Sequence, residues 1–92
     1  MSIEWSPDKN AALKERYGFG FERVVSALDE DRLLDERKHP NPERYAHQRQ
    51  LVVEIDGYAW VVCFVTDGST MFFKTMYPSR RANREYLRGR DG

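Results

Sequence analysis

The C-terminal part of the chain combines arginine side chains with a helical spacing that suits phosphate binding. Residues 74–92 hold six basic and two acidic groups, and Arg80, Arg84 and Arg88 recur at every fourth position. Side chains four residues apart share one face of a helix. A guanidinium presents a planar fork of donors that matches two phosphate oxygens at once. The pattern predicts a helix that binds a polyanion, with RNA as the first candidate, and a solvated amphipathic helix is the alternative.

Both histidines of the chain, His39 and His47, lie in one proline-containing segment together with Arg44. Histidine titrates near neutrality and can move protons when a phosphodiester is cleaved. RNA carries its own nucleophile, the 2′-hydroxyl, so cleavage needs a base, cations on the phosphate and an acid. We therefore predict that Arg44 and Arg80 clamp the phosphate, and that His39, His47 or Tyr86 moves protons. The alternative is that the histidines are exposed loop residues without a catalytic role.

Other cationic and aromatic side chains are expected to hold the RNA strand. We assign this role to Lys74, Arg81, Arg84 and Tyr86, while Arg81 is also spaced to pair with Glu85 across one helical turn. Bases stack on aromatic faces, which makes Tyr45, Tyr58 and Tyr77 further candidates. Two histidines with loosely spaced acids form a poor metal site, so neither a metal ion nor another cofactor is expected.

The composition predicts a single domain that spans all 92 residues and carries no net charge. The charge is nevertheless unevenly distributed, because residues 1–36 carry nine acidic and five basic groups, whereas the C-terminal end is basic. A neutral chain binds nucleic acid weakly unless specific contacts help. Cys63 is the only cysteine, which excludes an internal disulfide, and its apolar neighbours predict a buried thiol. We find no signal-peptide pattern and no long apolar run, so a cytoplasmic protein without a membrane partner is expected.

Capping signals and apolar periodicity predict the helices. Ser6, Pro7 and Asp8 form a helix start, and the helix is expected to run to Tyr17, burying Ala12, Leu13 and the stem of Arg16, before Gly18 ends it. Apolar residues at i, i+3, i+4 and i+7 predict a second helix, and they are Phe21, Val24, Val25 and Leu28. A third helix should begin after Ser79 as its N-cap.

The remaining segments predict strands and one long loop. A short strand is expected at residues 33–34, a loop at 37–48, and three further strands at 50–55, 58–65 and 70–77. Asp56-Gly57 and Asp67-Gly68 are the expected turns between these strands. The predicted fold class is α+β, with two N-terminal helices and a C-terminal helix packed on a small antiparallel sheet.

Three short blocks of the sequence resemble the BrnT-type toxins of type II toxin–antitoxin systems. The first is residues 3–10 (IEWSPDKN), followed by Lys14, Tyr17-Gly18 and Phe21-Glu22. The second is the close at residues 78–86 (PSRRANREY), and the third is Arg44 before the second half of the sheet. Arg44, Arg80 and Arg81 match the family pattern best, while Tyr17 stands where the family usually has histidine.

This resemblance implies a RelE-like ribonuclease fold and RNA cleavage that inhibits translation and growth. It also implies a small cognate antitoxin as partner, expected to bind DNA and able to bring toxin copies into an oligomer. The sequence therefore predicts a metal-independent ribonuclease toxin. The alternative is a non-catalytic interaction module of the same fold, whose arginines meet carboxylates of a partner protein instead of phosphates.

Overall fold

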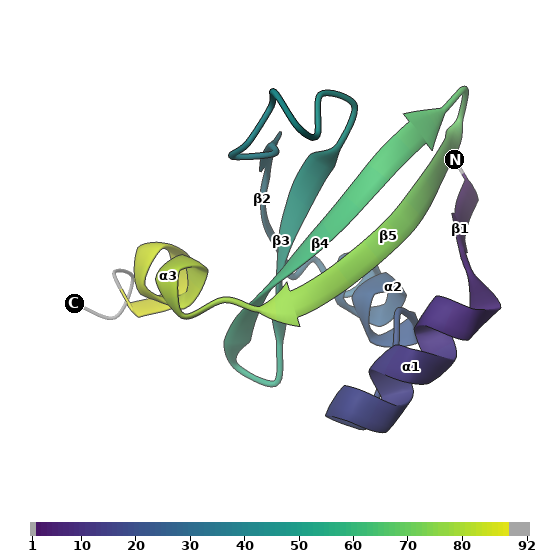
Figure 1. The fold of residues 1–92 in the computed structure, drawn as a ribbon. Coiled ribbons are helices and arrows are strands. Elements are labelled where there is room, and N and C mark those ends of the chain that lie inside the picture. The colour runs from purple at the N-terminus through teal and green to yellow at the C-terminus, as the bar shows by residue number, and fades with distance from the viewer. Residues whose placement is uncertain (1, 89–92) are drawn as a thin grey trace.

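Five strands form one mixed sheet in the order β1-β5-β4-β3-β2 (Figure 1). The computed structural model describes residues 2–88. The strands are β1 (Ser2–Trp5), β2 (Leu33–Lys38), β3 (Arg49–Ile55), β4 (Tyr58–Asp67) and β5 (Thr70–Pro78). The helices are α1 (Pro7–Tyr17), α2 (Glu22–Asp29) and α3 (Arg80–Asn83), and α3 continues into a π-helical turn, η1 (Arg84–Arg88). The α+β class and the three helices are confirmed.

The sheet is not purely antiparallel, because β1 pairs in parallel with the first half of β5. Ser2 lies opposite Thr70 and Trp5 opposite Phe73. This strand was not predicted from the sequence, and the expected antiparallel sheet is wrong at this edge. A four-residue strand just before a helix start is too short to show an alternating pattern. Its partner strand lies more than 60 residues away along the chain, since Ser2 pairs with Thr70. Long-range pairing of this kind leaves no local signal.

The strand β2 is longer than predicted and takes the first two residues of the expected loop. Arg37 pairs with Gln50 and Lys38 with Arg49 in the antiparallel ladder of β2 and β3. The prediction of a loop from residue 37 onward is therefore wrong at its start. Charged residues are common on edge strands, where they discourage pairing with other chains, and here they conceal the strand.

The helix α1 has the predicted ends but buries a different set of residues. The Ser6 side chain accepts from the Lys9 N–H at 3.3 Å, and Gly18 ends the helix with φ of 85°. Leu13 is buried as expected, whereas Ala12 is exposed, and the prediction for Ala12 is wrong. Asn10 is buried instead, because its amide ties α1 to the start of α2.

The central strand β4 is buried on both faces, which agrees with its continuous apolar sequence. On one face, α1 and α2 pack against the larger core, which includes Phe21, Phe64 and Phe73. On the other face, α3 and η1 cover a smaller apolar cluster of Val52, Ala59, Val61, Cys63 and Ala82, with Leu34, Tyr86 and Leu87 beside it. The burial of Cys63 is confirmed.

Two tight turns join β3 to β4 and β4 to β5. Asp56 and Gly57 both have positive φ, 53° and 80°, which suits the tight hairpin between β3 and β4 that was predicted. Gly68 has φ of 60° in the turn that follows β4.

Within residues 2–88, no helix has the length and apolarity needed to cross a membrane.

The contact between Asn10 and Gly20 generates a stability prediction. Asn10 Oδ1 accepts from the buried Phe21 N–H at 2.7 Å, while its Nδ2 donates to Glu22 at 2.9 Å. A Cβ at position 20 would collide with Asn10 Oδ1. Gly20→Ala should therefore lower the free energy of unfolding by about 2 kcal/mol in urea denaturation. Asn10→Ala should cost about 1–3 kcal/mol, because the Phe21 N–H loses its acceptor.

The double variant provides the control for this prediction. In an Asn10→Ala background the colliding oxygen is gone, so Gly20→Ala should cost clearly less than it does in the wild type. Fully additive losses would contradict the proposed contact.

Candidate nucleic-acid interface

Polar side chains of four strands gather on the sheet face opposite α1 and α2, which we call the open face. Directly opposed residues of antiparallel strands project to the same side of a sheet. The register joins Arg37 to Gln50, Gln50 to Cys63, and Cys63 to Thr75 across the sheet. The apolar end of this face is covered by α3 and η1, and this row of residues borders the cover.

Gln50 organises the centre of the open face. Its side chain is fully buried, at 0% exposure, although glutamine is polar. The Arg37 Nε donates to Gln50 Oε1 at 2.9 Å, and Gln50 Nε2 donates to the Tyr77 hydroxyl at 3.4 Å and approaches Cys63 Sγ at 3.6 Å. A buried amide is stable only when its donors and acceptors find partners. The network therefore holds Arg37 and Tyr77 in fixed positions on the face.

Arg37 is the guanidinium that the fold holds most firmly on the open face. Besides Gln50, its terminal nitrogen lies 3.9 Å from Glu85 of η1. About a third of the side chain, 32%, remains exposed. A held and partly exposed guanidinium is suited to bind phosphate, because the entropy cost of ordering its long side chain is already met.

Tyr86 links η1 to β2 through its hydroxyl group. Its hydroxyl donates to Asp35 Oδ2 at 2.5 Å. This hydrogen bond to a carboxylate raises the pKa of Tyr86, and burial raises it further, while Arg37 nearby lowers it. Tyr86 is therefore held in the protonated form and acts as a donor, which makes it a poor base.

Burial also raises the pKa values of Tyr77 and Cys63. The hydroxyl of Tyr77 loses part of its solvent, and the neighbouring Cys63 raises its pKa as well, against the opposing effects of Gln50 and Arg37. Burial raises the pKa of the Cys63 thiol, so a reactive thiolate is disfavoured. Tyr77 remains 39% exposed and can offer a neutral hydroxyl to a ligand on the open face.

The predicted arginines of the terminal helix lie at the edge of this face. Arg80, Arg81 and Arg84 are exposed on α3 and η1. Arg81 Nε pairs with Glu85 Oε1 at 3.4 Å, as expected from their spacing. Arg80 and Arg84 have no ion-pair partner among the described side chains. The side chain of Arg88 lies outside the described part of the structure.

The predicted histidines and Arg44 lie in the β2–β3 loop. The His39 ring is 4.3 Å from the Tyr45 ring, and its Nδ1 accepts from the Asn41 N–H at 3.0 Å. The Arg44 guanidinium lies 5.6 Å from the Tyr45 ring. His47 is exposed in the same loop. Tyr45 thus gathers His39 and Arg44 into one small cluster.

This loop and α3 lie at opposite ends of the sheet (Figure 1). In the register, the loop enters β3 level with Phe73 of β5, whereas α3 follows Pro78. The five residue steps from Phe73 to Pro78 span about 16 Å at the usual rise of a strand. The structure therefore does not bring Arg44 and Arg80 onto a single phosphate, and any shared ligand must extend along the face.

Lys74 lies between these two ends at an irregularity in the pairing of β4 and β5. Its Nζ is 5.2 Å from the centroid of the Phe72 ring, in a cation–π contact. Phe72 pairs with Val65 and is only partly buried. Lys74 therefore combines a charge with an aromatic face, which is the pairing that single-stranded nucleic acid uses.

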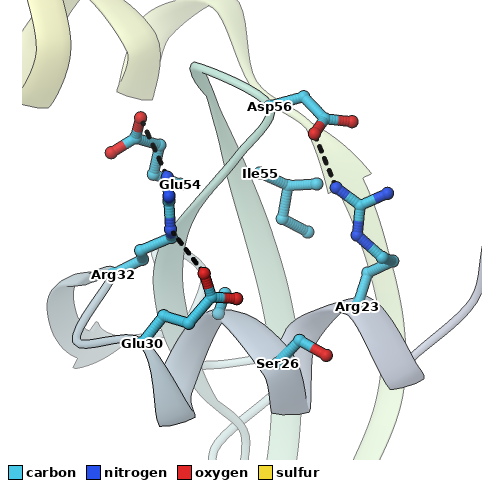
Figure 2. A pocket seen from close by; sticks show the side chains of 8 residues that line it. Arg23, Ser26, Glu30, Arg32, Glu54, Ile55 and Asp56 are labelled. Atoms are coloured by element: carbon cyan, nitrogen blue, oxygen red, sulfur yellow. Dashed lines mark hydrogen bonds and ion pairs between the residues drawn. The ribbon is translucent and has the colours of Figure 1, made fainter.

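A separate hollow of about 240 Å³ lies between α2 and the β3–β4 hairpin, but both of its arginines already pair with carboxylates (Figure 2). Arg23 pairs with Asp56 at 2.6 Å on one side. On the other side Arg32 lies 3.6 Å from both Glu30 and Glu54. Two arginines face three carboxylates here, so the hollow does not suit a phosphate.

Among residues 2–88, no group of three or more His, Cys, Asp and Glu side chains is placed to hold a metal ion. Neither histidine lies in the polar row of Arg37 and Gln50.

Three residues of this site were not predicted from the sequence, namely Arg37, Gln50 and Asp35. Arg37 and Asp35 were hidden because β2 was not recognised beyond residue 34. A signal for Gln50 did exist, since it occupies the polar position in the alternation of β3, opposite the inward-facing Leu51 and Val53. Its full burial depends on neighbours from three other segments and leaves no trace in the local sequence.

Comparisons with protein-family models, with curated proteins and with solved structures return no match to this chain.

The contact between Tyr86 and Asp35 predicts a pH dependence. The pKa of Tyr86 is raised above 10.0 in the folded protein, so its contribution to stability is complete below the unfolded value and is lost as pH rises through the folded value. Asp35→Asn should lower the Tyr86 pKa and weaken this loss of stability. Tyrosinate absorbance and urea unfolding, both followed above neutral pH, measure the two effects.

Tyr86→Phe serves as the control, because it removes the titrating group and should abolish the high-pH step assigned to it. An unchanged Tyr86 pKa in Asp35→Asn would contradict the role of this carboxylate.

Proposed function

We propose that the protein is a ribonuclease toxin of a toxin–antitoxin pair, with a RelE-like fold of the BrnT type, and that the open face binds its RNA substrate. The cleavage would need no metal ion, because the 2′-hydroxyl attacks the neighbouring phosphate. The proposal draws on the resemblance of the N- and C-terminal blocks and on the charge arrangement of the open face. The proposed partner is a small antitoxin.

One observation carries this proposal above all, namely the fixed position of Arg37. Its guanidinium is hydrogen-bonded to the fully buried Gln50 and lies at the border with the arginine-bearing helix. Transition states of phosphodiester cleavage gather negative charge on the phosphate oxygens, and preorganised donors stabilise that charge. We therefore add Arg37 to Arg80 as the pair that contacts the scissile phosphate.

The other predicted residues take roles along the RNA strand. Arg81 and Arg84 extend the cationic border, while Lys74 and Phe72 offer a stacking position nearer the loop. Arg44 contacts a different phosphate from Arg80, because the two lie at opposite ends of the sheet. His39 or His47 is the proposed group for proton transfer, since histidine titrates near neutral pH.

The non-catalytic interaction module is the second candidate, and the position of the histidines favours it. Both lie in the β2–β3 loop, which begins two residues after Arg37 but lies at the opposite end of the sheet from Arg80. A base must come within hydrogen-bond reach of the attacking hydroxyl to act. If neither histidine reaches the phosphate held by Arg37, the same face would bind carboxylates of a partner protein.

Growth and RNA integrity distinguish the two functions. Induction of the wild type should arrest growth and degrade RNA on a gel. Arg37→Ala and Arg80→Ala should each lower the cleavage rate by about 100-fold, which is the usual effect of removing one preorganised donor. Arg37→Lys keeps the charge but loses the fork of donors, so its cleavage rate should fall between those of the wild type and Arg37→Ala.

Arg32→Ala is the matched control, because Arg32 already pairs with carboxylates in the hollow beside α2, away from the open face. It should arrest growth like the wild type. Thermal unfolding of each variant separates loss of function from loss of fold. A folded wild type that neither arrests growth nor degrades RNA would favour the interaction module.

A further inference from the structure

A groove of about 260 Å³ separates α1 from the outer edge of β5. Its walls come from two elements, with Lys9, Ala12 and Arg16 on the helix and Thr75 and Tyr77 on the strand. The groove lies at the free side of β5, away from β4. The groove shares Thr75 and Tyr77 with the open face, but none of the residues proposed for RNA cleavage lines it.

The second half of β5 lacks a neighbouring strand on this side. The pairing of β1 with β5 ends at Trp5 opposite Phe73, because the chain then turns at Ser6 into α1. Among the described residues, the paired register of β1 and β5 stops at Phe73, so positions 74–77 have no partner residue in β1. Every second residue of an antiparallel ladder turns its N–H and C=O away from its partner strand. The edge therefore presents backbone groups that a further strand can bind.

The charges along this groove are positive and unmatched. Lys9 and Arg16 lie seven residues apart on one side of α1, both exposed. Neither has an ion-pair partner in the described part of the chain, and no carboxylate lines the groove. The hollow beside α2 differs, because each of its arginines already pairs with a carboxylate. A free pair of cations beside a free strand edge favours an acidic ligand.

The groove also has a firm apolar floor and room above it. Leu13 and Met76 are buried at its base, with 4% and 1% exposure. The small Ala12 side chain leaves space between the helix and the strand. The Arg16 guanidinium lies 5.3 Å from the Tyr17 ring, and that ring packs edge-on against Trp60 at 5.0 Å. These contacts hold the walls of the groove in place before any ligand binds.

We propose that this groove binds an extended acidic segment of a partner protein, which adds a strand to the free edge of β5. Backbone hydrogen bonds to the edge would supply affinity, while Lys9 and Arg16 would select carboxylates at alternate positions. Trp5 and Pro78 bound the free edge, so the added strand spans about 13 Å, or about four residues. The proposal does not depend on RNA cleavage and can fail or succeed independently of it.

The outer edge of β2 offers a useful contrast. It is also unpaired on one side, but Asp35 and Glu36 are followed there by Arg37 and Lys38. Mixed charges of this kind protect an edge strand from pairing. The β5 edge has no carboxylate between positions 74 and 77, and it faces a cationic helix instead.

Binding of a short peptide of alternating Glu and Val to the isotope-labelled full chain tests the proposal. Amide signals of residues 74–77 and of α1 should shift on titration, and no RNA is needed. A peptide with Lys in place of Glu should have an affinity at least about tenfold lower. The backbone nitrogens of the peptide can be methylated at every second residue in two alternating sets. Only one set should weaken binding, because only one set of N–H groups pairs with β5.

Charge-reversed variants provide the matched control. Arg16→Glu should weaken binding of the acidic peptide by about tenfold and improve binding of the Lys peptide. Lys38→Glu changes the net charge by the same amount on the far edge of the sheet, and should leave the affinity unchanged. Both variants should keep the wild-type unfolding temperature.

Three outcomes would overturn the proposal. Peptide-induced shifts that appear only on the open face, or nowhere, would show that the groove is not the binding site. Single-stranded RNA shifting the groove signals in place of the peptide would assign the cations to nucleic acid. Concentration-dependent shifts without any ligand would show that a second copy of the chain covers the edge.

Discussion

The burial of β4 on both faces is the constraint on which the rest of the structure depends. A strand that is apolar on both sides needs cover from both sides, because a domain of this size has little other apolar surface to bury. The pair α1 and α2 supplies one cover, and the short α3–η1 segment supplies the other. Since α3–η1 is short, it covers only part of the second face. The open face exists because this cover stops short.

The polar row on the open face follows from the same constraint. Where the apolar cover ends, the sheet still buries Gln50, and a buried amide requires partners. Arg37, Tyr77 and Cys63 supply them. The hydrogen bonds that satisfy Gln50 therefore also fix a guanidinium at the surface. A structural requirement and a candidate binding function use the same side chains here, so substitutions of Gln50 would affect both.

The neutral net charge of the chain conceals a division of charge among its surfaces. Carboxylates neutralise the arginines beside α2. Arg80 and Arg84 of α3 and η1, and the cations of the α1–β5 groove, have no ion-pair partner among the described side chains. Both unmatched sets border β5, which supplies Tyr77 to the open face and the free edge to the groove. The two surfaces are thus neighbours across one strand. A ligand in either one would touch the surroundings of Tyr77.

The sequence by itself determined the elements whose signals are local. The N-caps Ser6 and Ser79, the end of α1 at Gly18 and the Asp56-Gly57 turn each depend on a few neighbouring residues. So do the apolar alternation of β3 and the continuous apolar run of β4. Only the tertiary structure decided the partner of β1, the length of β2, the exposure of Ala12 and the burial of Gln50. Each of these depends on contacts between segments far apart in the chain, and such contacts leave no spacing pattern to read. The same reason explains why Arg80 was foreseen as a candidate while Arg37 was not.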